Sequence, residues 1–117
     1  VVLNSTNAKP ETAPMVVLIN RSTASSAEVI AGALQDRNRA VVLGEKSYGK
    51  GTVQEVLNLS DGSQLEITVG KYRTPNGRLI DQVGITPDLL VSDSDAVAKS
   101  VQVLGGLAAI DNKGQSK

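Results

Sequence analysis

The sequence contains no histidine, no cysteine, no tryptophan and no phenylalanine among its 117 residues, and it has only two tyrosines. Without histidine or cysteine, the chain cannot supply a Ser-His-Asp triad, a Cys-His pair, a zinc finger or a disulfide scaffold. Two tyrosines cannot form the stacking platform that single-stranded nucleic acids require. Any catalysis by this chain therefore needs a base other than histidine.

An excess of charge of one sign and long apolar runs are also lacking. Twelve Lys and Arg balance twelve Asp and Glu, which leaves no basic field to attract phosphate backbones, so we expect no nucleic-acid partner. The longest apolar run, residues 15–19, is far shorter than the roughly 20 residues of a bilayer span. The length suits one compact domain with a small core of Val, Leu, Ile and Ala.

A strand, a helix and a second strand are predicted in the first half of the chain. Residues 15–19 are apolar without alternation, which is typical of a strand covered on both faces, as in a parallel sheet. Residues 40–43 repeat this pattern. An amphipathic helix over about 25–36 is predicted from four apolar residues at helical spacing: Ala27, Ile30, Ala31 and Leu34. Together these elements predict a right-handed βαβ unit.

An antiparallel hairpin is predicted next. Residues 53–57 and 65–69 are rich in β-branched and alternating apolar positions, and the polar turn 60–63 separates them. The fold class expected from the whole pattern is α/β (α+β), with a βαβ unit of parallel strands followed by an antiparallel hairpin.

Weaker patterns predict the remaining elements. Residues 1–3 and 89–91 are each expected to form a short strand. Apolar residues recur at helical spacing over 97–108, but Gly105-Gly106 is expected to end or weaken that helix. Residues 111–117 are predicted to be disordered.

A serine-rich segment lies where the first strand gives way to the helix. Ser25 and Glu28 fit a capping box, in which side chains satisfy the first amides of the helix. The same geometry suits a nucleophilic serine, because amides and the positive end of a helix dipole stabilise an oxyanion. The two interpretations are compatible.

A glycine-rich segment follows the second strand and nearly matches the phosphate loop of nucleotide-binding proteins. Gly51 stands where the Mg²⁺-binding hydroxyl belongs, and Thr52 comes one residue late. The following residues alternate like a strand instead of opening the helix that a phosphate loop requires. A nucleotide site is therefore a weaker interpretation of this segment than either a surface turn or a loop that carries a catalytic lysine.

A serine hydroxyl needs a base to accept its proton, and lysine is the known substitute for histidine. An ordinary lysine amine has a pKa near 10.4, so burial or a neighbouring cation must favour its neutral form. Lys50 lies between Gly49 and Gly51, which permit a close approach of backbones, and we expect its amine to be buried. Lys46 lacks such neighbours.

Seven motifs, taken together and in order, resemble those of the carboxyl-terminal processing proteases, which are tail-specific serine proteases. The motifs are Ser22-Thr23-Ala24-Ser25-Ser26-Ala27-Glu28-Val29, Ala33-Leu34-Gln35-Asp36, Arg39-Ala40, Gly44-Glu45, Tyr48-Gly49-Lys50-Gly51-Thr52-Val53-Gln54, Tyr72-Arg73-Thr74-Pro75-Asn76-Gly77 and Gly84-Ile85-Thr86-Pro87-Asp88. The resemblance covers residues 15–91 and implies the ClpP/crotonase-like core of that family.

The resemblance also implies a serine endopeptidase with a Ser-Lys dyad. Ser25 aligns with the nucleophile, Lys50 with the general base and Gln54 with a residue that helps to position the lysine. The backbone amide of Ser26 would form half of the oxyanion hole, and a glycine-containing segment upstream would supply the other half. The family needs no metal and no cofactor.

The expected partners are proteins or peptides with unstructured carboxyl-terminal tails, which an upstream PDZ domain selects in this family. The resemblance further implies a location outside the cytoplasm, in the periplasm or cell envelope, and gives no oligomeric state. Residues 1–110 would then be the C-terminal part of a catalytic domain, with the upstream part and the PDZ domain outside this chain. A noncatalytic module that binds peptide tails is the alternative from another functional class.

Overall fold

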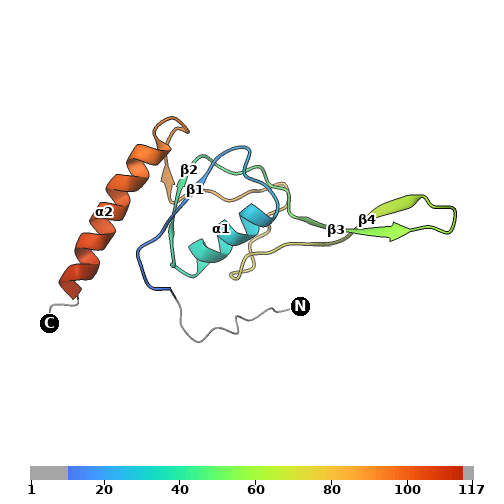
Figure 1. The fold of residues 1–117 in the computed structure, drawn as a ribbon, viewed down its shortest axis with the longest axis horizontal. Helices are drawn as coiled ribbons and strands as arrows, with labels where there is room; N and C mark the ends of the chain where they lie inside the picture. The colour runs from blue at the N-terminus through green and yellow to red at the C-terminus, as the bar shows by residue number, and fades with distance from the viewer. Residues whose placement is uncertain (1–10, 115–117) are drawn as a thin grey trace.

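The computed structural model describes residues 11–114, and its centre is a parallel sheet with one connecting helix (Figure 1). Strand β1 (Val16–Ile19) pairs with β2 (Val41–Gly44), and β2 pairs with β5 (Leu89–Leu90), both in parallel. Helix α1 (Ser26–Asp36) connects β1 to β2. The predicted parallel unit and the strand at 89–91 are confirmed, whereas the strand predicted at 1–3 lies outside the described residues.

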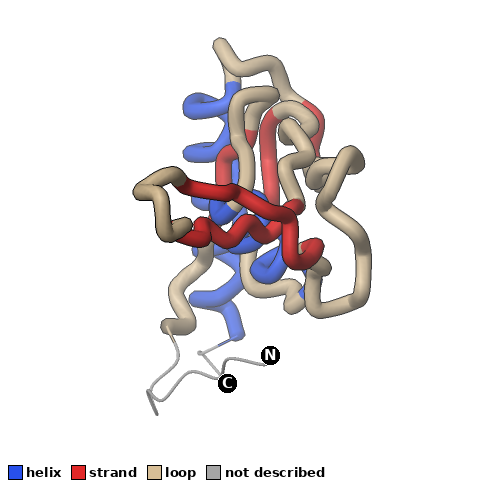
Figure 2. Tube along the Cα trace, turned by 90° about the vertical axis from the view of Figure 1, so that its right-hand side faces the viewer, coloured by secondary structure: helices blue, strands red, loops and turns tan. Residues whose placement is uncertain are grey.

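The predicted hairpin is also confirmed. Strands β3 (Thr52–Asn58) and β4 (Gln64–Lys71) pair antiparallel and project away from the parallel sheet (Figures 1 and 2). The turn of the hairpin contains a hydrogen bond of 2.9 Å from the Leu59 amide to the Ser63 carbonyl. The hairpin begins two residues after Lys50, so its base lies next to the segment that carries this lysine.

Helix α2 (Ala96–Gly114) is longer than predicted. It runs through Gly105-Gly106, so the helix does not end there, and the prediction of disorder is wrong over 111–114. A glycine costs a helix only about 1 kcal/mol relative to alanine, and good helix formers flank this pair. Residues 115–117 lie outside the described part. None of the described helices has the length and apolarity that a membrane span requires.

The face that α1 turns toward the core differs from the predicted stripe. Ile30 is 60% exposed and Ala27 is exposed, whereas Glu28 is completely buried together with Ala31 and Gly32. The hydrophobic pattern failed here because hydrogen bonds, described below, compensate the burial of the Glu28 carboxylate. Ala31 packs in a core cluster with Ile19, Val42, Ile80 and Ile85.

The prediction that the first strand is covered on both faces is wrong for β1. Leu18 is 41% exposed, whereas Val42 and Leu43 in the neighbouring strand β2 are inaccessible to solvent. The reason is the position of β1 at the edge of the sheet, where it pairs with β2 alone. Strand β2, which precedes the segment that carries Lys50, is therefore better buried than β1.

The carboxyl end of α1 is anchored by Asp36. Its carboxylate forms an ion pair with Arg78 and accepts a hydrogen bond from the Asn76 amide, 2.8 Å away. Burial raises the pKa of Asp36, but polar contacts with Thr74, Asn76 and Arg78 outweigh it and leave that pKa below the ordinary value of 3.8. A lowered folded-state pKa gives stability that is present above the unfolded-state pKa and is lost as the pH falls through the folded-state value.

We therefore expect Asp36→Asn to destabilise the protein in a pH-dependent manner. The loss at pH 7 should be about 1.5–3 kcal/mol, the range for a hydrogen bond to a charged group. The loss of stability should shrink as the pH falls below the unfolded-state pKa of 3.8, because the Asp36 carboxyl of the parent then becomes uncharged like the asparagine. Urea unfolding at pH 7 and pH 3 measures both differences, and an equal loss at both values would contradict this account.

Candidate active site

The segments that carry Ser25 and Lys50 leave neighbouring strands at the same edge of the sheet. Ile19 of β1 and Gly44 of β2 are paired, and Ser25 and Lys50 each follow six positions later. The segments are also joined beyond the strands, because the Tyr48 amide donates a hydrogen bond of 2.9 Å to the Thr23 carbonyl. The fold therefore brings together the two segments that the sequence analysis singled out.

Ser25 occupies a strained backbone conformation. Its φ of 57° and ψ of −124° are those of the first central residue of a type II′ turn, a position that glycine usually fills. Holding another residue there costs about 1–3 kcal/mol, and such strain is concentrated at functional sites. Ser25 is the N-cap of α1 and is partly exposed. A strained serine between a strand and a helix is the geometry of a nucleophile elbow.

Ser26 is the first residue of α1. Among the described residues, its amide has no hydrogen-bond acceptor, and the amide lies at the positive end of the helix dipole. An unpaired amide next to Ser25 suits an oxyanion donor. That role of Ser26 stays a prediction.

Lys50 is exposed, so the expectation of a buried amine is wrong for this structure. The physical reason lies in its neighbours, because the backbones of Gly49 and Gly51, and not the lysine side chain, are buried against residues 80–84. A Cβ at position 51 would lie 2.2 Å from the Asp81 amide nitrogen, so this close approach requires glycine. The Lys50 side chain has no hydrogen bond or ion pair within the described residues, which include Ser25.

Gln54 lies near the start of β3, at an irregularity in the pairing with β4 between Val53 and Gln54. Its side chain is exposed and makes no hydrogen bond in the described part of the chain, so no contact with Lys50 is present. Its role in positioning the lysine stays a prediction.

Glu28 is the site residue that sequence reasoning placed only as a helix cap. The structure contains the glutamate half of the predicted capping box, since Glu28 Oε2 accepts the Ser25 amide at 2.9 Å. The same carboxylate also accepts hydrogen bonds from the lysine segment, at the Gly49 and Lys50 amides. The sequence signal available was the presence of Glu28 in the motif around Ser25; its burial could not be read from the apolar pattern.

The phosphate-loop interpretation is wrong. A phosphate loop leads directly into a helix whose first amides help to hold the phosphates. Here the residues after Gly51 form strand β3 instead. The missing hydroxyl at position 51 and the missing helix both argue against a nucleotide site.

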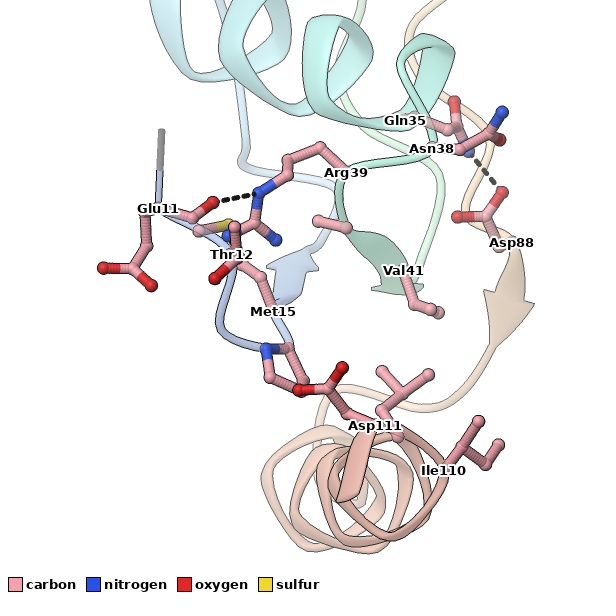
Figure 3. A pocket seen from close by; sticks show the side chains of 13 residues that line it. Glu11, Thr12, Met15, Gln35, Asn38, Arg39, Val41, Asp88, Ile110 and Asp111 are labelled. Carbon is pink, nitrogen blue, oxygen red and sulfur yellow. Dashed lines mark hydrogen bonds between the residues drawn. The ribbon is translucent and has the colours of Figure 1, made fainter. Parts of the chain in front are cut away.

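A hollow on the described surface adjoins the candidate site. An open groove of about 780 Å³ lies over the carboxyl ends of β1, β2 and β5, and its lining residues are Arg21, Glu45, Lys46, Ser47, Tyr48, Leu90, Val91 and Ser92. A second hollow of about 740 Å³ lies by α2 and the amino end of β2, where Val41, Asp88 and Ile110 line it (Figure 3). Ser25 and Lys50 line neither of these hollows, although Ser47 and Tyr48, in the segment just before Lys50, line the first.

Comparisons with known proteins agree with this arrangement. Residues 2–91 match the family model described as peptidase family S41. Carboxyl-terminal-processing peptidase 2, chloroplastic, of Arabidopsis thaliana is 52% identical over 85 residues, which are 73% of this chain and 16% of that protein. C-terminal processing peptidase, chloroplastic, of Tetradesmus obliquus is 46% identical over 82% of this chain and 21% of its own length.

A solved structure of a processing protease is also similar to this chain. The photosystem II D1 C-terminal processing protease superposes with a TM-score of 0.66 and 49% identity, over 68% of this chain and 20% of that one. The chain thus spans about a fifth of the length of the relatives that it matches. The family model alone covers well over half of this sequence, and the chain belongs to peptidase family S41.

Proposed function

We propose that this chain carries the Ser-Lys dyad of a serine endopeptidase that cleaves proteins near their carboxyl-terminal tails. The observation that carries the proposal is the strained backbone of Ser25 at the start of α1, in a chain of family S41. Residues 1–110 belong to the C-terminal part of the catalytic domain, and a PDZ domain upstream selects unstructured tails. The enzyme acts outside the cytoplasm; chloroplastic and bacterial relatives are compatible with this location.

The chemistry is acyl transfer without a metal or cofactor. Neutral Lys50 accepts the proton of the Ser25 hydroxyl while Ser25 Oγ attacks the carbonyl carbon of the scissile peptide, and the Ser26 amide donates to the oxyanion. When the tetrahedral intermediate collapses, the C–N bond breaks and the leaving amine takes the proton from Lys50. Water then gives a proton to Lys50 and attacks the acyl-enzyme. When this second intermediate collapses, the bond to Ser25 Oγ breaks, Ser25 takes the proton back from Lys50, and the new carboxyl end is released.

The open groove supports this assignment. It lies beside the segment of Lys50, and Tyr48 and Leu90 supply exposed apolar surface there. An extended peptide that continues from this groove past Tyr48 to Ser25 would cover the exposed Lys50 and remove water from its amine. Desolvation of this kind favours the neutral, proton-accepting form of a lysine. Substrate binding and activation of the base are therefore coupled in this proposal.

A fluorophosphonate, which phosphonylates activated serines with loss of fluoride, tests the proposal. The intact protein should be labelled on Ser25, and Ser25→Ala should abolish the label. Ser22→Ala is the matched control, because Ser22 is an exposed serine in the same segment, and it should keep the label. An unlabelled parent protein that still binds peptide tails would favour the noncatalytic binding module instead.

We expect Gln54→Ala to lower kcat/KM for a peptide substrate by about fivefold to 150-fold, less than the loss of the lysine itself. A hydrogen bond that orients a charged or buried partner is worth about 1–3 kcal/mol, which corresponds to this range. Steady-state hydrolysis measures the effect, and Glu55→Ala, an exposed neighbour on β3, serves as the control. A loss equal to that of Lys50→Ala would contradict a merely orienting role.

A further inference from the structure

Glu28 is a completely buried carboxylate without a cationic partner among the described residues. Four hydrogen-bond donors surround it instead. Oε1 accepts from the Ser47 hydroxyl at 2.5 Å and from the Gly49 amide at 2.7 Å. Oε2 accepts from the Ser25 amide at 2.9 Å and from the Lys50 amide at 2.8 Å. These bonds compensate the loss of water around the charge.

The division of donors between the two oxygens is informative. One atom, Oε2, binds the backbone amides of both members of the proposed dyad, so each amide nitrogen lies within 3 Å of the same point. The backbone of the proposed nucleophile is thereby fixed relative to the backbone of the proposed base. The bond to the Ser25 amide also acts on the residue whose backbone is strained.

Ser47 extends this network away from the dyad. Its hydroxyl donates to Glu28 and accepts a hydrogen bond of 2.6 Å from the Ile85 amide. The Ser47 amide in turn donates to the Ile85 carbonyl at 3.1 Å. Because Ile85 belongs to the buried core, Ser47 links Glu28 to the core through Oε1, the oxygen that does not bind the amides of Ser25 and Lys50.

We propose that Glu28 is the positioning residue of the dyad, which sets the spacing of Ser25 and Lys50 through their backbone amides, with Ser47 holding the carboxylate in place. The inference rests on the proposed function of the dyad. Glu28 neither accepts the proton nor touches the substrate in this account. Its contribution is the fixed geometry that a serine and a lysine on separate segments need, and displacements of about 1 Å can cost about 10²-fold in rate.

The isosteric amide cannot replace this carboxylate. A glutamine at position 28 carries one oxygen and one NH₂ group, and the NH₂ group faces hydrogen-bond donors in either orientation. In one orientation it opposes the amides of Ser25 and Lys50, and in the other it opposes the Gly49 amide. Glu28→Gln therefore removes the shared anchor while changing the volume little.

The test combines saturable fluorophosphonate labelling with amide hydrogen exchange in the intact protein. For Glu28→Gln we expect the maximal labelling rate at Ser25 to fall about 10²-fold with half-saturation changed less than about twofold. The amides of Ser25 and Lys50 should exchange faster, whereas those of the β1–β2 ladder should not. Ser47→Ala, which removes one of the four bonds, should show a smaller loss of the same kind.

Asp88→Asn is the matched control. Asp88 is a carboxylate that accepts the Val42 amide and the Gln35 side-chain amide, each at 2.8 Å, at the amino end of β2 and away from the dyad. The rate at which Ser25 is labelled in Asp88→Asn should stay within about twofold of the parent rate, because the spacing of the dyad does not depend on Asp88.

Labelling of Glu28→Gln and Ser47→Ala at the parent rate, with unchanged amide exchange, would overturn the inference and leave the proposed function intact. If Glu28→Gln does not fold, Ser47→Ala decides by the same readouts. A folded parent protein that is never labelled on Ser25 would instead refute the proposed function. The exchange rates of the Ser25 and Lys50 amides would then still show whether Glu28 fixes the two segments.

Discussion

Lys50→Ala is expected to abolish peptide hydrolysis and to slow the reaction of Ser25 with a fluorophosphonate by about 10²–10⁴-fold, the usual contribution of a general base. This chain contains no histidine that could accept the proton of Ser25 in place of this amine. The fold should remain, because the side chain of Lys50 is exposed and its amide, which binds Glu28, is kept in alanine. Fluorophosphonate labelling and urea unfolding of the same preparation measure the two effects.

Lys46→Ala provides the matched comparison for this result. Lys46 is an exposed lysine in the same segment and lines the groove beside it. Its removal changes the local charge by the same amount and should leave the maximal labelling rate nearly unchanged. If Lys46→Ala lost the activity and Lys50→Ala kept it, the base would have been assigned to the wrong lysine.

Replacing Ser25 by glycine is expected to abolish acylation and, at the same time, to stabilise the protein. Glycine adopts the φ of 57° and ψ of −124° without the steric cost that serine bears. The relief of about 1–3 kcal/mol exceeds the extra conformational entropy of glycine in the unfolded chain, about 0.5–1 kcal/mol. Ser25→Gly should therefore unfold at a higher urea concentration than the parent.

Ser25→Ala separates the loss of acylation from the gain in stability. Alanine lacks the hydroxyl and is equally inactive, but its Cβ keeps the steric strain at this position. We expect its stability to lie below that of Ser25→Gly by about 1 kcal/mol. Equal stabilities of the two variants would mean that the backbone of residue 25 relaxes freely, and the argument from strain would then fail.

The elements predicted correctly are those whose signal is local. Periodicity located α1, the buried strand β2 and the hairpin of β3 and β4 to within one or two residues. Helix α2 was cut short in the prediction because Gly105-Gly106 was given more weight than the good helix formers around it. The low helix propensity of one or two residues does not end a helix where the neighbouring residues favour it.

The parts of the site that could not be predicted depend on groups distant in the sequence. Glu28 is buried because donors some twenty positions further along, at Ser47, Gly49 and Lys50, converge on it. The exposure of Lys50 follows from the packing of its glycine neighbours against Asp81 and the residues beside it. The identities of Ser25 and Lys50 came from family motifs, since no periodic pattern distinguishes a nucleophile from a helix cap.

The central claim is that Ser25 attacks and that a neutral lysine takes its proton. The most direct measurement is the rate of fluorophosphonate labelling of the intact protein across a pH series, with the modified residue located by peptide mass spectrometry. We predict one modified residue, Ser25, and a rate that rises with pH in the parent protein and that no longer does so in Lys50→Ala. Modification of Ser22 or Ser26 in place of Ser25, or a pH dependence that is the same with and without Lys50, would contradict the claim.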